Sequence, residues 1–260
     1  MSALVVLDDV SMTYGRGATA VPAIESVSLE IQKGEFIAVV GPSGCGKSSL
    51  MKLISGLHPS SQGSLSVAGE QVTKPLKSVG MAFQNSNLLP WRTCVDNVLL
   101  PLEIVPPHRQ RIRSQRAQYK QKAEDLLKSV GLTGFTDKFP WELSGGMQQR
   151  ASICRALIHE PEILMLDEPF GALDAFTREE LWCALRDIHA ARGVTVMLVT
   201  HDLREAVFLA DTVYVMSNRP GRIVKRCTVT LPRPRDLEVT YTQAFQDVVH
   251  ELRGMIGGKH

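Results

Sequence analysis

The sequence predicts an α/β fold with a mostly parallel sheet, an antiparallel β edge subdomain and an inserted α-helical subdomain. Short apolar runs alternate along the chain with longer stretches of helical periodicity. Continuous apolar strands separated by helices are typical of parallel sheets that helices cover on both faces. One interval in the middle of the chain lacks strand-like runs, and this interval indicates the insertion.

Each core strand is expected where a short apolar run is bounded by turn or charged residues. The expected strands are residues 36–40, 79–83, 163–166, 194–199 and 212–216. Helical periodicity predicts helices at residues 47–55, 117–130, 145–159, 175–191 and 203–209. Residues 1–35 and 63–69 are expected to form antiparallel strands at the edge of the core.

The interval from about residue 88 to 160 interrupts the alternation of strands and helices. It contains several prolines and a second half that is rich in helix-forming residues. We expect a helical subdomain here, at about 88–160, inserted into a core of residues 4–87 and 161–220. A single domain is thus predicted over residues 4–235, and a helical extension is predicted at 236–260.

Composition argues against several classes of protein. The 260 residues carry a net charge of +2 and are 44% hydrophobic, which is typical of a globular domain and unlike a nucleic-acid binder that relies on bulk positive charge. The apolar runs are strand-sized, so no membrane span is expected, and the N-terminus lacks the basic flank of a secretory signal. Five scattered cysteines without CxxC spacing predict reduced thiols in a cytosolic protein.

Residues 36–50, FIAVVGPSGCGKSSL, combine an apolar strand, a glycine-rich loop and a helix start. The loop fits the P-loop pattern GxxxxGK followed by S or T. Its N–H groups surround a β-phosphate, Lys47 reaches the β- and γ-phosphates, and the Ser48 hydroxyl coordinates Mg²⁺. The sequence therefore predicts a nucleotide site, and a lowered thiol pKa is expected for Cys45 beside Lys47. The residues assigned to the loop are Gly41, Pro42, Ser43, Gly44, Cys45, Gly46, Lys47, Ser48 and Ser49.

Two carboxylates end the apolar run ILMLDEP at residues 163–169. Ligands bind at the carboxyl ends of strands in open α/β sheets, so Asp167 is expected to hold Mg²⁺ directly or through water. Glu168 is the candidate base that polarises the attacking water. The alternative is a strand end that simply turns into a loop.

Three further residues are candidates for contact with the nucleotide. His201 follows an apolar strand and can contact the γ-phosphate, Gln84 can touch both Mg²⁺ and the attacking water, and Tyr14 can stack on the adenine ring. A purely structural role stays open for His201 and Gln84, and packing in the core stays open for Tyr14.

A second glycine motif, LSGGMQQR, opens a predicted helix at residues 143–150 but contains no lysine. In chain order, GPSGCGKS, Gln84, LSGGMQQR, ILMLDE, ALD and His201 resemble the nucleotide-binding subunit of an ATP-binding cassette (ABC) transporter. The resemblance covers residues 4–220 and implies a P-loop NTPase core that binds ATP and Mg²⁺ and hydrolyses the ATP. The residues it assigns to catalysis are Lys47, Gln84, Glu168 and His201, and those it assigns to the metal are Ser48, Gln84 and Asp167.

The resemblance also implies a use for the second glycine motif. Two copies of the chain pair head to tail around two ATP molecules, and Ser144, Gly145 and Gly146 contact a γ-phosphate held by the phosphate loop of the other copy. Asp174 lies at the seam and helps to couple the two sites. Met147 departs from the glutamine that is commonest in the family, but the serine and the glycines are unchanged.

The motifs LSGGMQQR, LLPWRT, DEPFGALDAFTR and NRPGRI resemble those of the nitrate/sulfonate/taurine-type importers. This narrower resemblance implies uptake of a small solute such as a sulfonate, taurine or nitrate. It implies transmembrane permease subunits as partners, an extracytoplasmic solute-binding protein indirectly, and a peripheral place on the cytoplasmic face of the inner membrane. Leu88, Leu89 and Trp91 are the expected docking surface for the permease, with packing inside the helical subdomain as the alternative.

Two basic segments are candidates for contact with anionic headgroups: residues 108–122, and the tail from Arg219 to Arg235. Solvated surfaces are expected instead, since the run at 108–122 has no apolar face for membrane insertion.

Two other function classes are weighed against the importer. An ABC ATPase of DNA repair or translation carries a long coiled-coil insertion or two cassettes in one chain, and the sequence shows neither. A P-loop kinase or GTPase shares GPSGCGKS but has no use for LSGGM. An ATPase of another importer subfamily is the nearest alternative, and no nucleic-acid partner is expected.

Overall fold

The computed structural model describes residues 3–15 and 17–257. Contacts divide the chain into two compact units. The first unit comprises Met1–Leu76 and Gly193–His260, and the second unit comprises Lys77–Arg192. Over the described ranges, no helix is long and apolar enough to cross a membrane.

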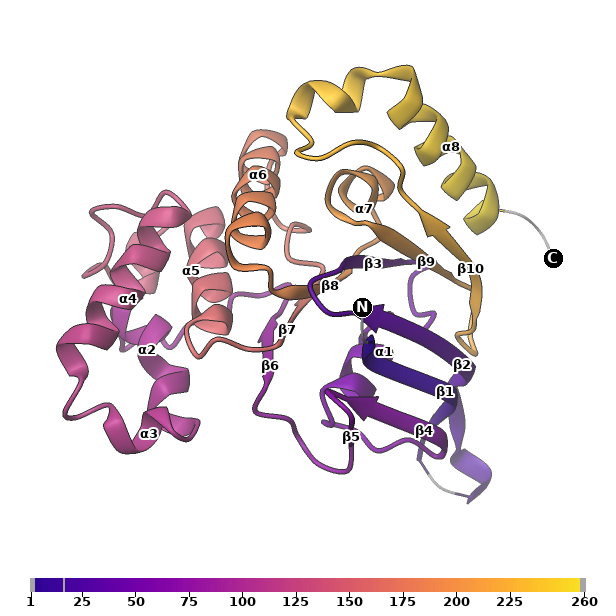
Figure 1. Cartoon of the computed structure of the whole chain (residues 1–260), viewed down its shortest axis with the longest axis horizontal. Helices are drawn as coiled ribbons and strands as arrows, with labels where there is room; N and C mark the ends of the chain where they lie inside the picture. Colours follow the sequence, from indigo (N-terminus) through magenta and orange to yellow (C-terminus); the bar gives the residue numbers. More distant parts are fainter. Residues whose placement is uncertain (1–2, 16, 258–260) are drawn as a thin grey trace. The chain divides into compact units, whose positions relative to one another are not determined.

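The first unit contains an antiparallel sheet with the strand order β2-β1-β4-β5. Its strands are β1 (Ala3–Tyr14), β2 (Val21–Gln32), β4 (Gln62–Val67) and β5 (Glu70–Gln71), with a short 3₁₀ turn at Gly17–Thr19. Figure 1 shows β1, β2 and β4 side by side. The expected antiparallel edge is therefore confirmed, although residues 1, 2 and 16 of the predicted segment lie outside the described residues.

The other strands of the first unit follow the order β10-β9-β3-β8. Strands β3 (Phe36–Val40), β8 (Thr195–Val199) and β9 (Thr212–Met216) are parallel, and all their residues are buried. This burial explains why the runs are apolar throughout instead of alternating. Helices α1 (Lys47–Ile54) and α7 (Leu203–Leu209) match the predicted segments to within one residue at each end.

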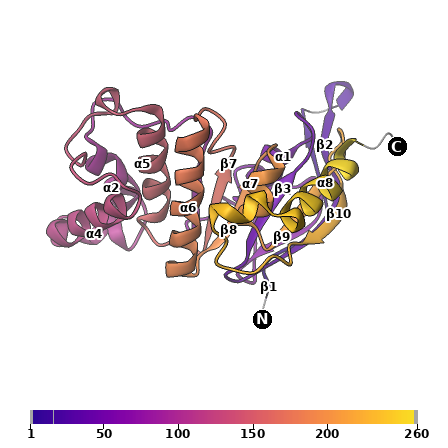
Figure 2. The same cartoon turned by 90° about the horizontal axis from the view of Figure 1, so that it is seen from above.

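The basic tail forms a strand that the sequence analysis did not predict. Strand β10 (Ile223–Thr228) pairs antiparallel with β9, and the chain continues into a 3₁₀ turn (Leu237–Tyr241) and helix α8 (Gln243–Gly257). Helix α8 packs against α7 and β9 (Figure 2). Phe245 and Leu252 are its buried contacts.

Arg235 contradicts the expectation of a solvated tail. Its side chain is 2% exposed, whereas Arg219, Arg222 and Arg226 are exposed as expected. The guanidinium donates to the carbonyl oxygens at the end of α7: those of Val207 (3.0 Å), Phe208 (3.2 Å) and Ala210 (2.7 Å). Burial lowers the pKa of Arg235 to about 10. The arginine is buried because helix α7 leaves carbonyl groups at its end that need donors.

The second unit contains two parallel strands and most of the helices. The strands are β6 (Val79–Ala82) and β7 (Ile163–Asp167). The helices are α2 (Cys94–Ile104), α3 (His108–Arg111), α4 (Arg116–Ser129), a 3₁₀ turn at Pro140–Glu142, α5 (Gly145–Leu157) and α6 (Ala175–Arg192). Helices α2, α4 and α5 pack on one another, and α5 also packs on β6.

Helix α2 was not among the predicted helices, and Pro101 lies inside it. Thr93 caps the helix by accepting a hydrogen bond from the Asp96 N–H (3.3 Å), and the helix ends a few residues after the proline. Val98 and Leu102 on this helix are fully buried. Burial of this apolar face against α4 and α5 outweighs the hydrogen bond that the proline removes.

Candidate functional site

The phosphate loop, residues 41–48, connects β3 to α1 in the first unit. Gly46 is the N-cap of α1 with φ 109°, and no side chain caps the helix. A Cβ on Gly46 would lie 2.7 Å from the carbonyl oxygen of Ala23, so both the backbone angle and the space require glycine. The first N–H groups of α1 are thus presented by a loop that can approach an anion closely.

The Lys47 side chain folds back over this loop. Its Nζ donates to the carbonyl oxygens of Gly41 (2.9 Å) and Pro42 (3.0 Å), and the residue is only 5% exposed. Within the described residues, no carboxylate forms an ion pair with it. The ammonium group therefore places a positive charge at the loop, where a phosphate is expected.

The lowered thiol pKa expected for Cys45 is wrong. The thiol is buried, at 2% exposure, and burial raises its pKa. The positive charge of Lys47 acts in the opposite direction but is the smaller effect. Cys45 is therefore a packed part of the loop, near the position where a Cβ on Gly41 would lie (3.1 Å), and not an activated thiolate.

Tyr14 lies at the end of β1, beside α1. Its hydroxyl is 3.2 Å from the Ser49 hydroxyl oxygen, and its ring meets the edge of His58 with a centroid distance of 5.1 Å. The ammonium group of Lys52 lies 5.8 Å from the ring centroid. The tyrosine is half-buried, so it contacts α1 while part of its side chain remains accessible.

His201 is exposed in the turn between β8 and α7. Hydrogen bonds on either side hold this turn in place. The buried Thr200 hydroxyl donates to the Glu205 carboxylate and accepts from the Asp202 N–H (3.0 Å), and Asp202 caps α7 through the Arg204 N–H (2.8 Å). The imidazole is thus presented from a rigid turn at the carboxyl end of β8.

In the second unit, Asp167 is the last residue of β7 and Glu168 follows it directly. Both residues are half-buried. Glu168 has φ 46°, a left-handed conformation that costs a non-glycine residue about 1–3 kcal/mol. Its carbonyl oxygen accepts from the Gly171 N–H (3.2 Å), which holds the turn. A conformation of this kind persists only where the surrounding structure over-determines it.

Three of the predicted motifs line one cavity of about 310 Å³ in the second unit. They are the segment that starts at Gln84, the beginning of LSGGMQQR, and DEPFGALD. The lining residues are Gln84, Asn85, Ser86, Asn87, Gly145, Gln148, Gln149, Pro169, Ala172 and Leu173. A Cβ on Gly171 would lie 3.3 Å from the Gln84 Nε2. The structure therefore brings together motifs that lie far apart in the sequence.

The LSGGM motif forms the beginning of α5. Ser144 is the N-cap, and its hydroxyl accepts from the Met147 N–H (3.3 Å). A Cβ on Gly146 would lie 2.4 Å from the Thr177 Cγ2, so this glycine is needed for internal packing. A Cβ on Gly145 would meet nothing within 4 Å, and Ser144 and Gly145 are both exposed. Nothing in the described part of the chain requires a glycine at 145.

Comparison with known proteins identifies the family. Residues 24–171 match the family described as ABC transporter. The chain belongs to the ABC transporter family. It is an ATP-binding ATPase subunit, and its fold is the P-loop α/β fold that the sequence predicted.

Two curated relatives and one solved structure show how far the similarity extends. The chain is 39% identical over 244 residues to the aliphatic sulfonates import ATP-binding protein of Bacillus cereus (strain ATCC 10987), covering 94% of this chain and 92% of the relative. It is 42% identical over 212 residues to the taurine import ATP-binding protein of Escherichia coli (strain K12), covering 82% and 80%. The dimeric post-hydrolysis structure of the ATP-binding cassette MJ0796, bound to ADP and phosphate, has a TM-score of 0.73 and 30% identity, covering 88% of this chain and 100% of that one.

In this ABC ATPase, Asp174 caps the region where α6 begins. Its Oδ1 accepts from the Thr177 N–H (3.1 Å), and its carbonyl oxygen accepts from the Arg178 N–H (3.0 Å). Hydrogen bonds from Thr177 hold the pKa of the Asp174 carboxyl below its ordinary value. The carboxylate is exposed and ionised at neutral pH, and Phe176 beside it is 83% exposed.

Sequence analysis of the ABC ATPase missed three side chains that hold the site's segments in place. They are Asn97, Gln149 and Arg155, which lie inside helices and bond to the backbone of residues 83–93. A single asparagine, glutamine or arginine within a helical pattern gives no signal of its own, because every residue carries the carbonyl group to which such a side chain donates.

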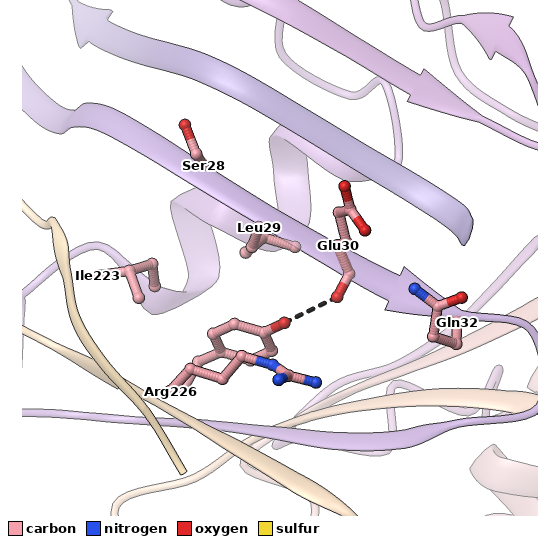
Figure 3. Close-up of a pocket in the computed structure, with 7 residues that line it drawn as sticks. Ser28, Leu29, Glu30, Gln32, Ile223 and Arg226 are labelled. Atoms are coloured by element: carbon pink, nitrogen blue, oxygen red, sulfur yellow. Dashed lines mark hydrogen bonds between the residues drawn. The ribbon is translucent and has the colours of Figure 1, made fainter. Parts of the chain in front are cut away.

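A second cavity of the ABC ATPase, about 350 Å³, lies in the first unit (Figure 3). Its lining residues are Ser28, Leu29, Glu30, Gln32, Tyr214, Ile223 and Arg226. The Tyr214 hydroxyl donates to the carbonyl oxygen of Glu30 (2.7 Å). None of the predicted site residues lines this cavity, so it is separate from the predicted nucleotide site.

Proposed function

We propose that this chain is the ATPase subunit of an importer for a small solute of the sulfonate or taurine class. The observation that carries the proposal is the identity of about 40% to import ATP-binding proteins for aliphatic sulfonates and for taurine, over most of both chains. The narrower motifs, LLPWRT and NRPGRI among them, support the same subfamily.

In the proposed reaction, the phosphate loop binds the β- and γ-phosphates of ATP. Lys47 and the N–H groups at the start of α1 neutralise their charge, and Tyr14 lies against the adenine. His201 contacts the γ-phosphate from its rigid turn. Support comes from the buried Lys47 ammonium at the loop and from the exposure of His201.

The donors proposed for Mg²⁺ are the Ser48 hydroxyl, the Gln84 amide oxygen and the Asp167 carboxylate. Oxygen donors of these kinds are what Mg²⁺ takes in phosphate sites, so the residues fit the ion. Bound there, Mg²⁺ neutralises charge on the phosphates. Glu168 accepts a proton from the attacking water while Gln84 orients that water.

The LSGGM motif is proposed to act on ATP bound to a second copy of the chain. Ser144 and Gly145 are exposed at the beginning of a long helix, where N–H groups and the helix dipole favour an anion. Gly145 has no internal packing reason to be glycine, which fits a close approach by a group outside the chain. Asp174 is proposed to lie at the same seam between the copies.

A permease is proposed to dock on the segment that carries Trp91, which would place the chain at the cytoplasmic face of the inner membrane. Trp91 is 71% exposed, whereas Leu88 is 9% exposed and belongs to the interior of the helical region. The fully buried Asn97 donates to the carbonyl oxygens of Leu89 (3.1 Å) and Arg92 (3.0 Å). The tryptophan is therefore presented on a rigid segment, and presentation of this kind lowers the entropic cost of binding.

Trp91→Glu should abolish assembly with the permease while leaving the basal ATPase activity of the chain within about twofold of wild type. The exposed indole is expected to be an anchor residue, and a carboxylate cannot replace its apolar contact. Co-purification of the chain with a tagged permease measures this directly. Tyr241→Glu is the matched control, since Tyr241 is 74% exposed and lies in the first unit. Assembly and transport that survive Trp91→Glu would exclude this docking surface.

The import function is tested with the chain reconstituted with its permease and binding protein in liposomes. ATP hydrolysis should rise severalfold on addition of taurine or an alkanesulfonate outside, and the same solute should accumulate inside. Amino acids serve as competing solutes in parallel assays. Stimulation by another solute class alone would assign the chain to a different importer subfamily. Failure to assemble with any membrane subunit would favour the non-transport alternative.

A further inference from the structure

Helix α5 binds the backbone of the segment that begins at Gln84. The Gln149 Nε2 donates to the carbonyl oxygen of Phe83 (2.9 Å), directly before Gln84. Arg155 donates through Nη1 to the carbonyl oxygen of Asn87 (2.8 Å) and through Nη2 to that of Ser86 (2.7 Å). The backbone on both sides of Gln84 is therefore attached to one helix.

These hydrogen bonds form in a partly desolvated place. Gln149 is 3% exposed, and burial lowers the pKa of the half-buried Arg155. A guanidinium taken out of water needs its hydrogen bonds, so the two carbonyl oxygens are strong partners for it. Asn87, one of the two acceptors, has a left-handed φ of 46°. The arginine thus holds a turn that a non-glycine residue adopts at a cost.

The same network reaches the N-terminal end of α5. The Ser86 hydroxyl donates to the Gln148 Oε1 (3.1 Å), and the Gln148 Nε2 donates to the carbonyl oxygens of Pro140 (2.9 Å) and Leu143 (3.2 Å). Leu143 directly precedes Ser144. The segment 83–87 and the LSGGM motif are therefore joined through side chains of one helix.

We propose that Arg155 and Gln149 are positioning residues that make Gln84 and the start of α5 move as one piece. Any displacement of α5 would carry the carbonyl groups of residues 83, 86 and 87 with it, and with them the Gln84 amide. The contact of Ser144 with a γ-phosphate and the contact of Gln84 with the attacking water would then be gained and lost together. This inference rests on the proposed function, because it uses the roles proposed for Gln84 and Ser144.

Arg155→Lys tests the inference in the full-length chain. A single ammonium cannot reproduce the fork that reaches two carbonyl oxygens, so kcat for ATP hydrolysis should fall about tenfold. The KM for ATP should stay within about twofold, because the phosphate loop is unchanged. If Arg155→Lys acted only by lowering stability, it would reduce the fraction of active protein. An arginine that holds another segment would then give the same loss when changed to lysine.

Arg150→Lys is the matched control. Arg150 lies on the same helix and also binds a backbone carbonyl, that of Val130 (2.9 Å), together with the Glu180 carboxylate (2.5 Å). In the described structure, neither of these hydrogen bonds reaches the segment 83–87. The kcat of Arg150→Lys should stay within about twofold of wild type, even if the melting temperatures of both variants fall equally. An equal loss of kcat in both variants would overturn the proposal.

A double-mutant cycle with Gln84→Ala shows whether Arg155 acts through Gln84. If it does, the variant with both changes should hydrolyse ATP within about twofold of the rate of Gln84→Ala alone. If the double variant instead loses hydrolysis rate by the product of the two single losses, Arg155 acts independently of Gln84 and the proposal is overturned. If Arg155→Lys does not fold, Gln149→Met carries the same cycle, because it removes only the bond to the Phe83 carbonyl.

The cycle also separates this inference from the proposed function. A large loss in Gln84→Ala with no loss in Arg155→Lys would overturn the positioning role alone. Full activity of Gln84→Ala would contradict the role proposed for Gln84 itself, and the positioning role would fall with it.

Discussion

Glu168→Gln should lower kcat for ATP hydrolysis by about a thousandfold while ATP binding is retained. Glutamine has the shape of glutamate and can adopt the same backbone, but it cannot accept the proton of the attacking water. Glu168 has a left-handed φ of 46°, and glutamine can adopt this backbone conformation as glutamate does. ATP should then remain bound without being cleaved, and the ATP-bound dimer should accumulate.

Single-turnover hydrolysis and size-exclusion chromatography with ATP and Mg²⁺ measure both parts of this prediction. Glu162→Gln is the matched control, because Glu162 is an exposed carboxylate directly before β7. The control should keep its kcat within about twofold. A variant Glu168→Gln that hydrolyses ATP at the wild-type rate would exclude Glu168 as the base.

Ser144→Arg should reduce hydrolysis at least about a hundredfold and abolish ATP-driven dimerisation, while the Kd for ATP stays within about twofold. Ser144 and Gly145 are exposed, so a bulky cation is tolerated in the single chain but blocks the approach of a second copy. The change also removes the N-cap of α5, which costs about 1 kcal/mol of stability and is too small to unfold the chain.

Equilibrium dialysis measures the Kd for ATP, and the fraction of dimer in the presence of ATP measures dimerisation. The two measurements together show whether the change affects ATP binding or only dimerisation. Ser114→Arg places the same side chain on another exposed surface of the second unit and should change neither quantity. Loss of ATP binding itself in Ser144→Arg would show that the motif serves the nucleotide of its own chain. The cross-subunit role would then be wrong.

The sequence predicted the helices and strands that a continuous pattern of apolar residues marks. Strands β3 and β9 and helix α7 lie where the apolar runs and helical periodicity placed them, because burial on both faces leaves a continuous apolar run in the sequence. The phosphate loop was recognisable for a similar reason. Gly46 needs a positive φ and a close backbone approach, and both needs are visible as a glycine at a set spacing.

Predictions failed where the deciding partner lies elsewhere in the chain. Helix α2 was not among the predicted helices, and burial of Val98 and Leu102 against neighbouring helices stabilises it although Pro101 lies inside it. The thiol of Cys45 was expected to be acidic, yet its burial raises the pKa more than Lys47 lowers it. Arg235 looked like one more solvated arginine of the tail, although the end of α7 binds it.

The sequence by itself determined that this chain is an ABC ATPase, because six short motifs, each made of residues with few alternatives, occur in the order and spacing of that family. Only the tertiary structure decided how these motifs are held. Arg155 and Gln149 bind carbonyl oxygens, which every residue carries, so no residue type in the segment 83–87 marks it in advance as their partner. Contacts from a side chain to a distant backbone leave no pattern in the sequence, and they appear only when the chain is folded.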